Sequence, residues 1–267
     1  MSYRLMSLWP INKKNGPRSA FEKVGLEEVI KNPEEPYTEI VSLSNELFFQ
    51  AVYADKAEAK VCVTCHNGHS NSPKNDFKLG SVMGGIYISF PLGKENQEID
   101  KTEHLLAPEV VADYIHSILE SDRTVYSEYI VNRLQEKKIT YATEFWYEED
   151  ALMLPAQFIK NATALIHKVR KNLGLDLKLI SLWPVNRHSG PANKFERMGL
   201  EYVVRNPFRP FIGFKELGGK QYFQAVYPDF AVSKACVDCH NTHPLSPKRD
   251  FKLNDVMGGI VVTLWLD

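Results

Sequence analysis

The sequence has only four cysteines among its 267 residues, and all four lie in Cys-x-x-Cys-His segments. No cysteine is left over for a disulfide or a nucleophile. No apolar run approaches the ~18 residues that a membrane-spanning helix needs. The first residues also lack the apolar core of a signal peptide. A net charge of −1 gives no reason to expect binding to nucleic acid or to an anionic membrane.

The remaining composition is that of an ordinary globular protein. Hydrophobic residues make up 44% of the chain and charged residues 24%, so a core can form. Self-comparison finds two copies of one domain at a constant offset of 174 positions, without insertion or deletion. The matching segments are 7–12 with 181–186, 49–53 with 223–227, 62–67 with 236–241, 76–79 with 250–253, and 83–86 with 257–260.

The two copies have unequal amounts of chain before their first matching segment. The second has a long helical lead-in, whereas the first has only a few residues. We therefore predict three parts: a C-terminal half-domain at 1–92, a linker at 93–106, and a complete domain at 107–267. We expect the helices that the first copy lacks to come from an upstream segment or from another part of an assembly.

Apolar spacing predicts two helices in that lead-in, at 108–135 and 155–172, and a further short helix at 193–204. Strand-like segments follow at 177–183, 221–227 and 259–266, and the first copy repeats them. Antiparallel strands with helices beside them predict an α+β fold. Each Cys-x-x-Cys-His segment falls between the last two strands of its copy.

The Cys-x-x-Cys-His pattern is the signature of covalent haem attachment. Each thiol forms a thioether to one vinyl group of the haem, and the histidine then ligates the iron from below the ring. The pattern predicts two covalently bound c-type haems. Their attachment and proximal residues are Cys62, Cys65 and His66 in the first copy, and Cys236, Cys239 and His240 in the second.

Two other interpretations of the motif remain open. Zinc could use Cys62, Cys65, His66 and His69, but Cys2His2 sites normally separate their two ligand pairs by about a dozen residues. A redox-active dithiol normally occurs in a βαβ context, which is not predicted here. The repetition of the motif at one offset favours haem over both.

Several segments together resemble a bacterial c-type haem sensor-like domain family with a PAS-like fold. The resemblance covers 107–267 as a full domain and 5–90 as a C-terminal half. It implies two PAS-like antiparallel-sheet domains with flanking helices, the first lacking its N-terminal helices. The segments that carry it are 122–126, 154–158, 181–186, 236–241 and 251–259.

Members of this family are periplasmic cytochromes and the extracytoplasmic parts of membrane-bound signalling proteins. The resemblance therefore implies a periplasmic or extracytoplasmic location, with a signal or anchor segment outside the present chain. A cyanobacterial member uses a helix cysteine as its distal iron ligand. The present chain has no spare cysteine, so any sixth ligand must differ.

Three residues are candidates for the distal ligand. His116 lies on the predicted long helix, and Met83 and Met257 hold matching places before a Gly-Gly pair. For each, the alternative is a packing role, which is common for methionine. Arg123 either pairs with a haem propionate or lies at the helix surface. We assign His69 and its repeat partner His243 to hydrogen bonds with a propionate or a loop.

We expect a redox- or gas-sensing dihaem cytochrome, because its PAS-like frame can couple a cofactor to a movable element. The alternative is a periplasmic electron carrier without a sensing role. No acid–base pair or nucleophile suggests an enzyme. Expected partners are haem, a diatomic gas or a redox protein, and a second copy or a membrane-bound signalling protein, but not nucleic acid.

Overall fold

The computed structural model describes residues 1–94, 106–169 and 173–266. Two compact units are present, Met1–Leu106 and Ala107–Asp267. Most of the predicted linker, 95–105, lies outside the described residues. Its first residues, Gly93 and Lys94, are the end of a strand rather than linker. No helix in the described part of the chain is long and apolar enough to cross a membrane.

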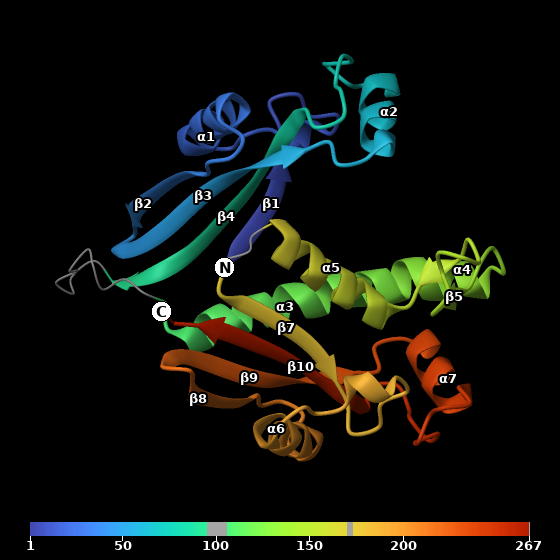
Figure 1. Cartoon of the computed structure of the whole chain (residues 1–267). Helices are drawn as coiled ribbons and strands as arrows, with labels where there is room; N and C mark the ends of the chain where they lie inside the picture. Colours follow the sequence, from blue (N-terminus) through green and yellow to red (C-terminus); the bar gives the residue numbers. More distant parts are fainter. Residues whose placement is uncertain (95–105, 170–172, 267) are drawn as a thin grey trace. The chain divides into compact units, whose positions relative to one another are not determined.

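The first unit is a four-stranded antiparallel sheet with one long helix on a face and the first Cys-x-x-Cys-His segment on another helix (Figure 1). The strand order is β1-β4-β3-β2. Its elements are β1 (Ser2–Met6), the 3₁₀ turn η1 (Lys13–Asn15), α1 (Ala20–Lys31), β2 (Tyr37–Leu43), β3 (Glu46–Lys56), α2 (Lys60–Gly68) and β4 (Val82–Lys94).

The second unit contains an equivalent sheet in the order β7-β10-β9-β8, preceded by additional helices. The α+β fold with two PAS-like antiparallel sheets is thus confirmed. The lead-in consists of α3 (Pro108–Val125), η2 (Tyr126–Asn132), α4 (Arg133–Glu136), β5 (Ala142–Thr143), β6 (Leu152–Met153) and α5 (Pro155–Val169). The sheet part consists of β7 (Leu175–Ile180), η3 (Arg187–Ser189), α6 (Lys194–Arg205), β8 (Phe211–Leu217), β9 (Lys220–Phe230), α7 (Lys234–Thr242) and β10 (Val256–Trp265).

Sequence periodicity located these elements incompletely. The helix predicted at 108–135 contains a π-helical stretch, η2, and β7 ends before Trp183 rather than at it. Strands β2 and β8 were not predicted, although each pairs with the following strand through a tight turn. Positive φ angles at Ser44 and Asn45 form the first turn, and those at Gly218 and Gly219 form the second. Such pairs are a hairpin signal that is available in the sequence.

Helices cover both faces of the second sheet (Figure 1). Ala112 of α3 and Ile159 of α5 pack on one face, against Phe223 and Ile260. Leu200 and Val203 of α6 pack on the other face. In the first unit, α1 packs on its sheet in the same manner as α6, with Leu26 and Val29 fully buried. The described part of the first unit contains no counterpart of α3 or α5.

The Gly-Gly pair that follows each candidate methionine permits close packing between strands. A Cβ atom on Gly84 would lie 2.3 Å from the carbonyl oxygen of Met6, and one on Gly258 would lie 2.4 Å from that of Ile180. Neither position can therefore hold a side chain without moving the edge strand. The glycines therefore allow β1 and β7 to approach the neighbouring strand closely in the two units.

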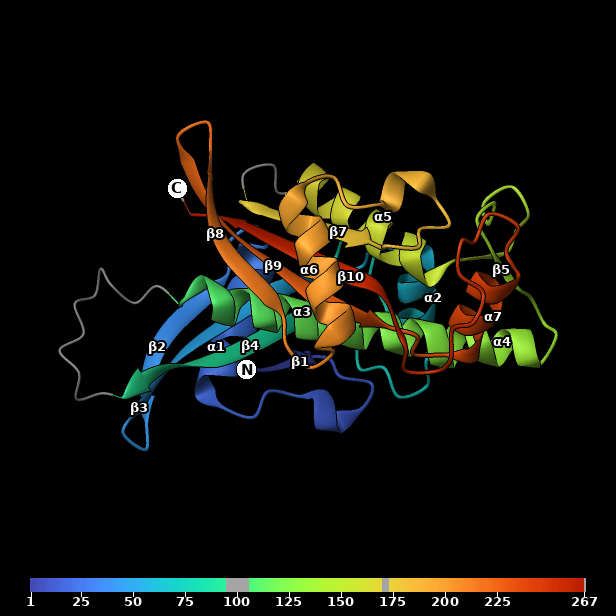
Figure 2. The same ribbon diagram turned by 90° about the horizontal axis from the view of Figure 1, so that it is seen from below.

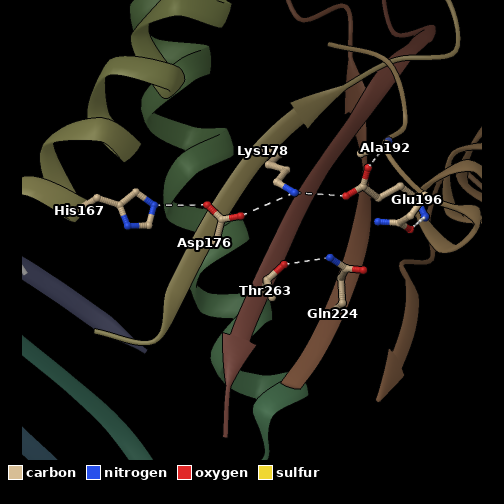
Figure 3. A network of polar contacts seen from close by, with 8 residues as sticks. His167, Asp176, Lys178, Ala192, Glu196, Gln224 and Thr263 are labelled. Carbon is tan, nitrogen blue, oxygen red and sulfur yellow. Dashed lines mark hydrogen bonds and ion pairs between the residues drawn. The ribbon is translucent and has the colours of Figure 1, made fainter. Parts of the chain in front are cut away.

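A polar network joins the edge of the second sheet to two helices (Figure 3). His167 of α5 lies 3.3 Å from Asp176 of β7, and Lys178 lies 3.4 Å from the Glu196 carboxylate. Glu196 also accepts a hydrogen bond from the backbone N–H of Ala192 at 2.7 Å. On the sheet itself, Gln224 donates to Thr263 across neighbouring strands at 3.0 Å. These contacts position the α6 amino terminus and lie on elements other than the cysteine helices.

Candidate haem sites

Each Cys-x-x-Cys-His segment is helical. The first lies on α2 and the second on α7, and each follows one of the two central strands of its sheet, β3 or β9. Helical geometry brings residues at spacings of three and four to the same side of the helix. Both thiols and the imidazole therefore share one face, as attachment to a single flat cofactor requires.

A cavity of about 300 Å³ lies on that face of the first unit. It contains both cysteines and the histidine of the motif, so the sequence-predicted attachment residues do come together. The residues that line it are Asp55, Lys56, Val61, Cys62, Cys65, His66 and Met83.

The histidine of each motif makes an edge-on contact with a phenylalanine ring. The His66 ring lies 5.9 Å from the Phe77 ring at an interplanar angle of 88°. Phe77 in turn meets the indole of Trp9 in an edge contact at 5.8 Å. The second unit has the same distances among its equivalent residues, which are His240, Phe251 and Trp183.

An asparagine after the histidine closes the following loop, a role that the sequence analysis missed. Asn67 donates to the carbonyl of Phe77 at 2.9 Å and accepts from the N–H of the same residue at 3.0 Å. Asn241 makes the same pair of hydrogen bonds to Phe251. The sequence did indicate a shared role for this asparagine, because it follows the Cys-x-x-Cys-His motif in both copies. Through this clamp, the loop holds the aromatic edge against the imidazole.

The donor set fits an iron porphyrin. The Nδ1 atoms of His66 and His240 are buried and have no hydrogen-bond partner among the described residues. Burial lowers the pKa of His240, and His243 and Arg123 lower it further. A lowered pKa favours the neutral imidazole, which is the form that ligates iron. Two thiols and an imidazole on one helix face thus match the donor set of c-type haem.

The zinc interpretation gains no support from the geometry. In the described residues, no group of three or more His, Cys, Asp or Glu side chains could hold a metal ion. His69 instead accepts a hydrogen bond from the Asn71 N–H at 3.1 Å, and His243 accepts one from Leu245 at the same distance. These two histidines therefore make hydrogen bonds within the loop, which is one of the two roles predicted for them.

The second site differs from the first because the lead-in helix packs on it. Segment η2 contacts α7, and both views place α7 beside this end of the helix (Figures 1 and 2). Just before η2, the Arg123 guanidinium forms a buried ion pair with Asp229 and donates to the Phe230 carbonyl at 3.2 Å. Arg123 is thus buried and paired within the protein, so it does not lie at the helix surface. π-Helical segments often occur at functional sites.

His116 lies on α3, about 10 Å before Arg123 along the helix axis. Its ring stacks on Tyr227 with centroids 4.1 Å apart, and the Tyr227 hydroxyl donates to Asp113 at 2.7 Å. Burial lowers the pKa of His116 to about 4. Its Nε2 atom is buried without a partner in the described chain. Iron ligation by His116 stays a prediction.

Met83 and Met257 occupy equivalent buried positions. Met83 packs with Ala57 and Phe77 and contacts Cys62. Met257 packs in the same way beside Cys236. Each thioether therefore has an apolar environment next to the first cysteine of its motif, and ligation by either methionine also stays a prediction.

Comparison with known proteins places these features in a family. The sequence model of the Tll0287-like family matches residues 1–91 and 104–264. No curated protein matches the chain. The crystal structure of the cyanobacterial haem protein Tll0287 aligns with 13% sequence identity and a TM-score of 0.39, covering 61% of this chain and 98% of that one. The chain belongs to the Tll0287-like family.

Proposed function

We propose that the chain is a dihaem c-type cytochrome that senses redox state or a small ligand. The observation that carries the haem assignment is the shared face of Cys62, Cys65 and His66 on α2, repeated on α7. The cyanobacterial Tll0287 structure is described as a haem protein, which supports the same cofactor. Haem c bound at both helices would supply one-electron chemistry and, with an open axial position, binding of a diatomic gas.

Sensing is favoured by the connection between the second site and the lead-in helix. The haem would bind on α7, which contacts the π-helical segment η2. Arg123, one turn earlier, is buried and ion-paired at the end of β9. A change of charge or ligation at the iron would therefore act on a helix that leads away from the site. That is the coupling that a sensor requires.

The second candidate function is electron transfer without sensing. The first site favours it, because Cys65 is exposed and the cavity beside it is open. An exposed haem edge is sufficient for electron exchange with a redox protein. Neither proposal assigns a catalytic reaction to the chain.

Location and partners follow from the cofactor. In bacteria, thioether attachment of haem takes place outside the cytoplasm, so we propose a periplasmic or extracytoplasmic protein. The output would be received by a redox protein, by a second copy, or by a membrane-bound signalling partner.

Intact mass and the pyridine haemochrome spectrum test the haem assignment. After coexpression with a haem-maturation system, we expect the mass of the chain plus two haems. The variants C62A/C65A and C236A/C239A should each lose one haem, whereas Thr64→Ala and Asp238→Ala, inside the same motifs, should lose none. A folded protein of unmodified mass, or one that contains zinc, contradicts the proposal.

Spectroscopy of the reduced protein separates the two functions. Carbon monoxide or nitric oxide should bind at one haem at least and change the protease sensitivity of α3 and η2, or reduction alone should do so. If neither treatment alters the protein and both haems remain six-coordinate, the protein is an electron carrier.

A further inference from the structure

The two sites carry the same acidic residue but differ in what neutralises it. Asp55 ends β3 opposite Gly84, and Asp229 ends β9 opposite Gly258, in the same sheet register. Asp229 forms a buried ion pair with Arg123, and the exposed fractions of the two side chains are 8% and 5%. Among the described residues, no ion pair joins Asp55 to a cation.

The net charge beside the iron-binding histidine therefore differs between the two units, because Arg123 balances Asp229 whereas no described ion pair balances Asp55. At the first site, Asp55 and His66 line one cavity. Burial raises the pKa of Asp55, and the interaction with His66 opposes that rise. At the second site, burial lowers the pKa of His240, and His243 and Arg123 lower it further. The Arg123 guanidinium is paired with Asp229. The sequence repeat conceals this difference, because Arg123 lies on the lead-in helix α3 rather than in either repeat.

We propose that Arg123 and Asp55 set the two haems at different reduction potentials, with the haem at His240 higher than the haem at His66. The inference rests on the proposed dihaem function and deepens it. Electrons delivered to the protein would then collect at the second site, which is the site that contacts η2.

The physical reason is the change of iron charge on reduction. A ferric iron that accepts one electron loses one unit of positive charge, so a nearby cation favours the ferrous state and a nearby carboxylate favours the ferric state. Arg123 balances Asp229 within an almost fully buried pair, so the second haem lacks the uncompensated carboxyl group that the first has in Asp55.

Other charges near the sites weaken this contrast without reversing it. At the first site, the cation Lys56 is offset by Glu34, whose carboxylate oxygen lies 2.5 Å from its ammonium nitrogen. At the second site, Glu120 lies one helical turn before Arg123, but burial raises its pKa and so reduces its negative charge. The charge of Arg123 opposes this rise in the pKa of Glu120.

A spectroelectrochemical titration of the full dihaem protein tests the proposal. We expect two one-electron components, each assigned by its absence from one of the single-haem variants, C62A/C65A or C236A/C239A. The component that remains in C62A/C65A should have the higher potential. If both haems are attached but the potentials coincide or are reversed, the inference fails while the proposed function stands. If no haem is attached, the proposed function itself fails.

Charge variants then identify the cause. Arg123→Gln should lower the reduction potential of the second haem. Arg123→Lys, which keeps the positive charge, should leave that potential close to the value in the parent protein. Asp55→Asn should raise the potential of the first haem. The control variants are Arg133→Gln on α4 of the second unit and Asp76→Asn, which is exposed in the first unit.

Two outcomes overturn the assignment: a shift in Arg123→Gln no larger than in Arg133→Gln, or a shift in Asp55→Asn no larger than in Asp76→Asn. If Arg123→Gln does not retain both haems, Arg123→Lys and Asp55→Asn decide the question. Asp55 lies in the first unit, so its replacement leaves the buried ion pair of the second unit intact.

Discussion

Arg123 on α3 forms a buried ion pair with Asp229 at the end of β9. The pair fixes the lead-in helix to the strand that runs directly into the second Cys-x-x-Cys-His helix. It is therefore a structural connection, and its guanidinium also contributes to the lowered pKa of His240.

We predict that Asp229→Asn destabilises the second unit by about 3–5 kcal/mol, because it leaves the buried Arg123 cation unpaired. The equivalent change Asp55→Asn should cost less than about 1 kcal/mol, since no described cation pairs with Asp55. Chemical unfolding followed by circular dichroism measures both. Equal losses of stability would show that the ion pair is not the cause.

Asn241→Ala should destabilise the loop after α7 by about 1–3 kcal/mol, because two hydrogen bonds to the Phe251 backbone are lost. Asn67→Ala should have the same effect in the first unit. Asn71→Ala, an exposed asparagine in the equivalent loop, serves as control and should change little. Amide hydrogen exchange at Phe251 and Phe77 reports on the clamp directly. Unchanged protection would contradict it.

Gly258→Ala should cost about 2 kcal/mol or more, because the new methyl group would lie 2.4 Å from the Ile180 carbonyl oxygen. Gly190→Ala is the matched control, since the nearest atom to its Cβ is 3.8 Å away. We expect the control to lie within about 0.5 kcal/mol of the parent. Comparable melting temperatures for the two variants would show that β10 can move away from β7.

His116 should make stability depend on pH. Its pKa is about 4 in the folded protein against an ordinary value of 6.5, so the unfolded chain binds more protons between these values. The free energy of unfolding should therefore fall as the pH drops from about 6.5 to 4, by at most about 3 kcal/mol. Below about pH 4, protonation of His116 should cause no further loss of stability. His116→Gln should remove this component, whereas the exposed His188→Gln should not.

Absorption spectra recorded over the same pH range add a second test. If His116 ligates the iron, protonation displaces it and the haem spectrum changes between these pH values in the parent protein. A parent whose stability and spectrum are both independent of pH in this interval would contradict the burial of a neutral His116.

The sequence by itself identified the candidate attachment residues. Cys62, Cys65 and His66 lie within about one helical turn of each other. Their identification therefore depends only on local spacing and not on a correct prediction of the strands. The repeat at constant offset also located the equivalent candidate residues in the second copy. The structure then showed that the aromatic and asparagine contacts around them are the same in both copies. Strands β2 and β8 were missed because their exposed, mixed faces have weak alternation.

Only the tertiary structure decided how the two sites differ. Arg123 and Asp229 are far apart in the sequence, and no periodicity relates a helix position to a strand end. Their pairing depends on the packing of α3 and α5 over the second sheet, where Ala112 and Ile159 lie against Phe223. That packing fixes which residues of the helix reach the end of β9. A buried charge is stable only beside its counter-ion, so the long-range packing of apolar residues determines where this cation lies and which histidine it acts on.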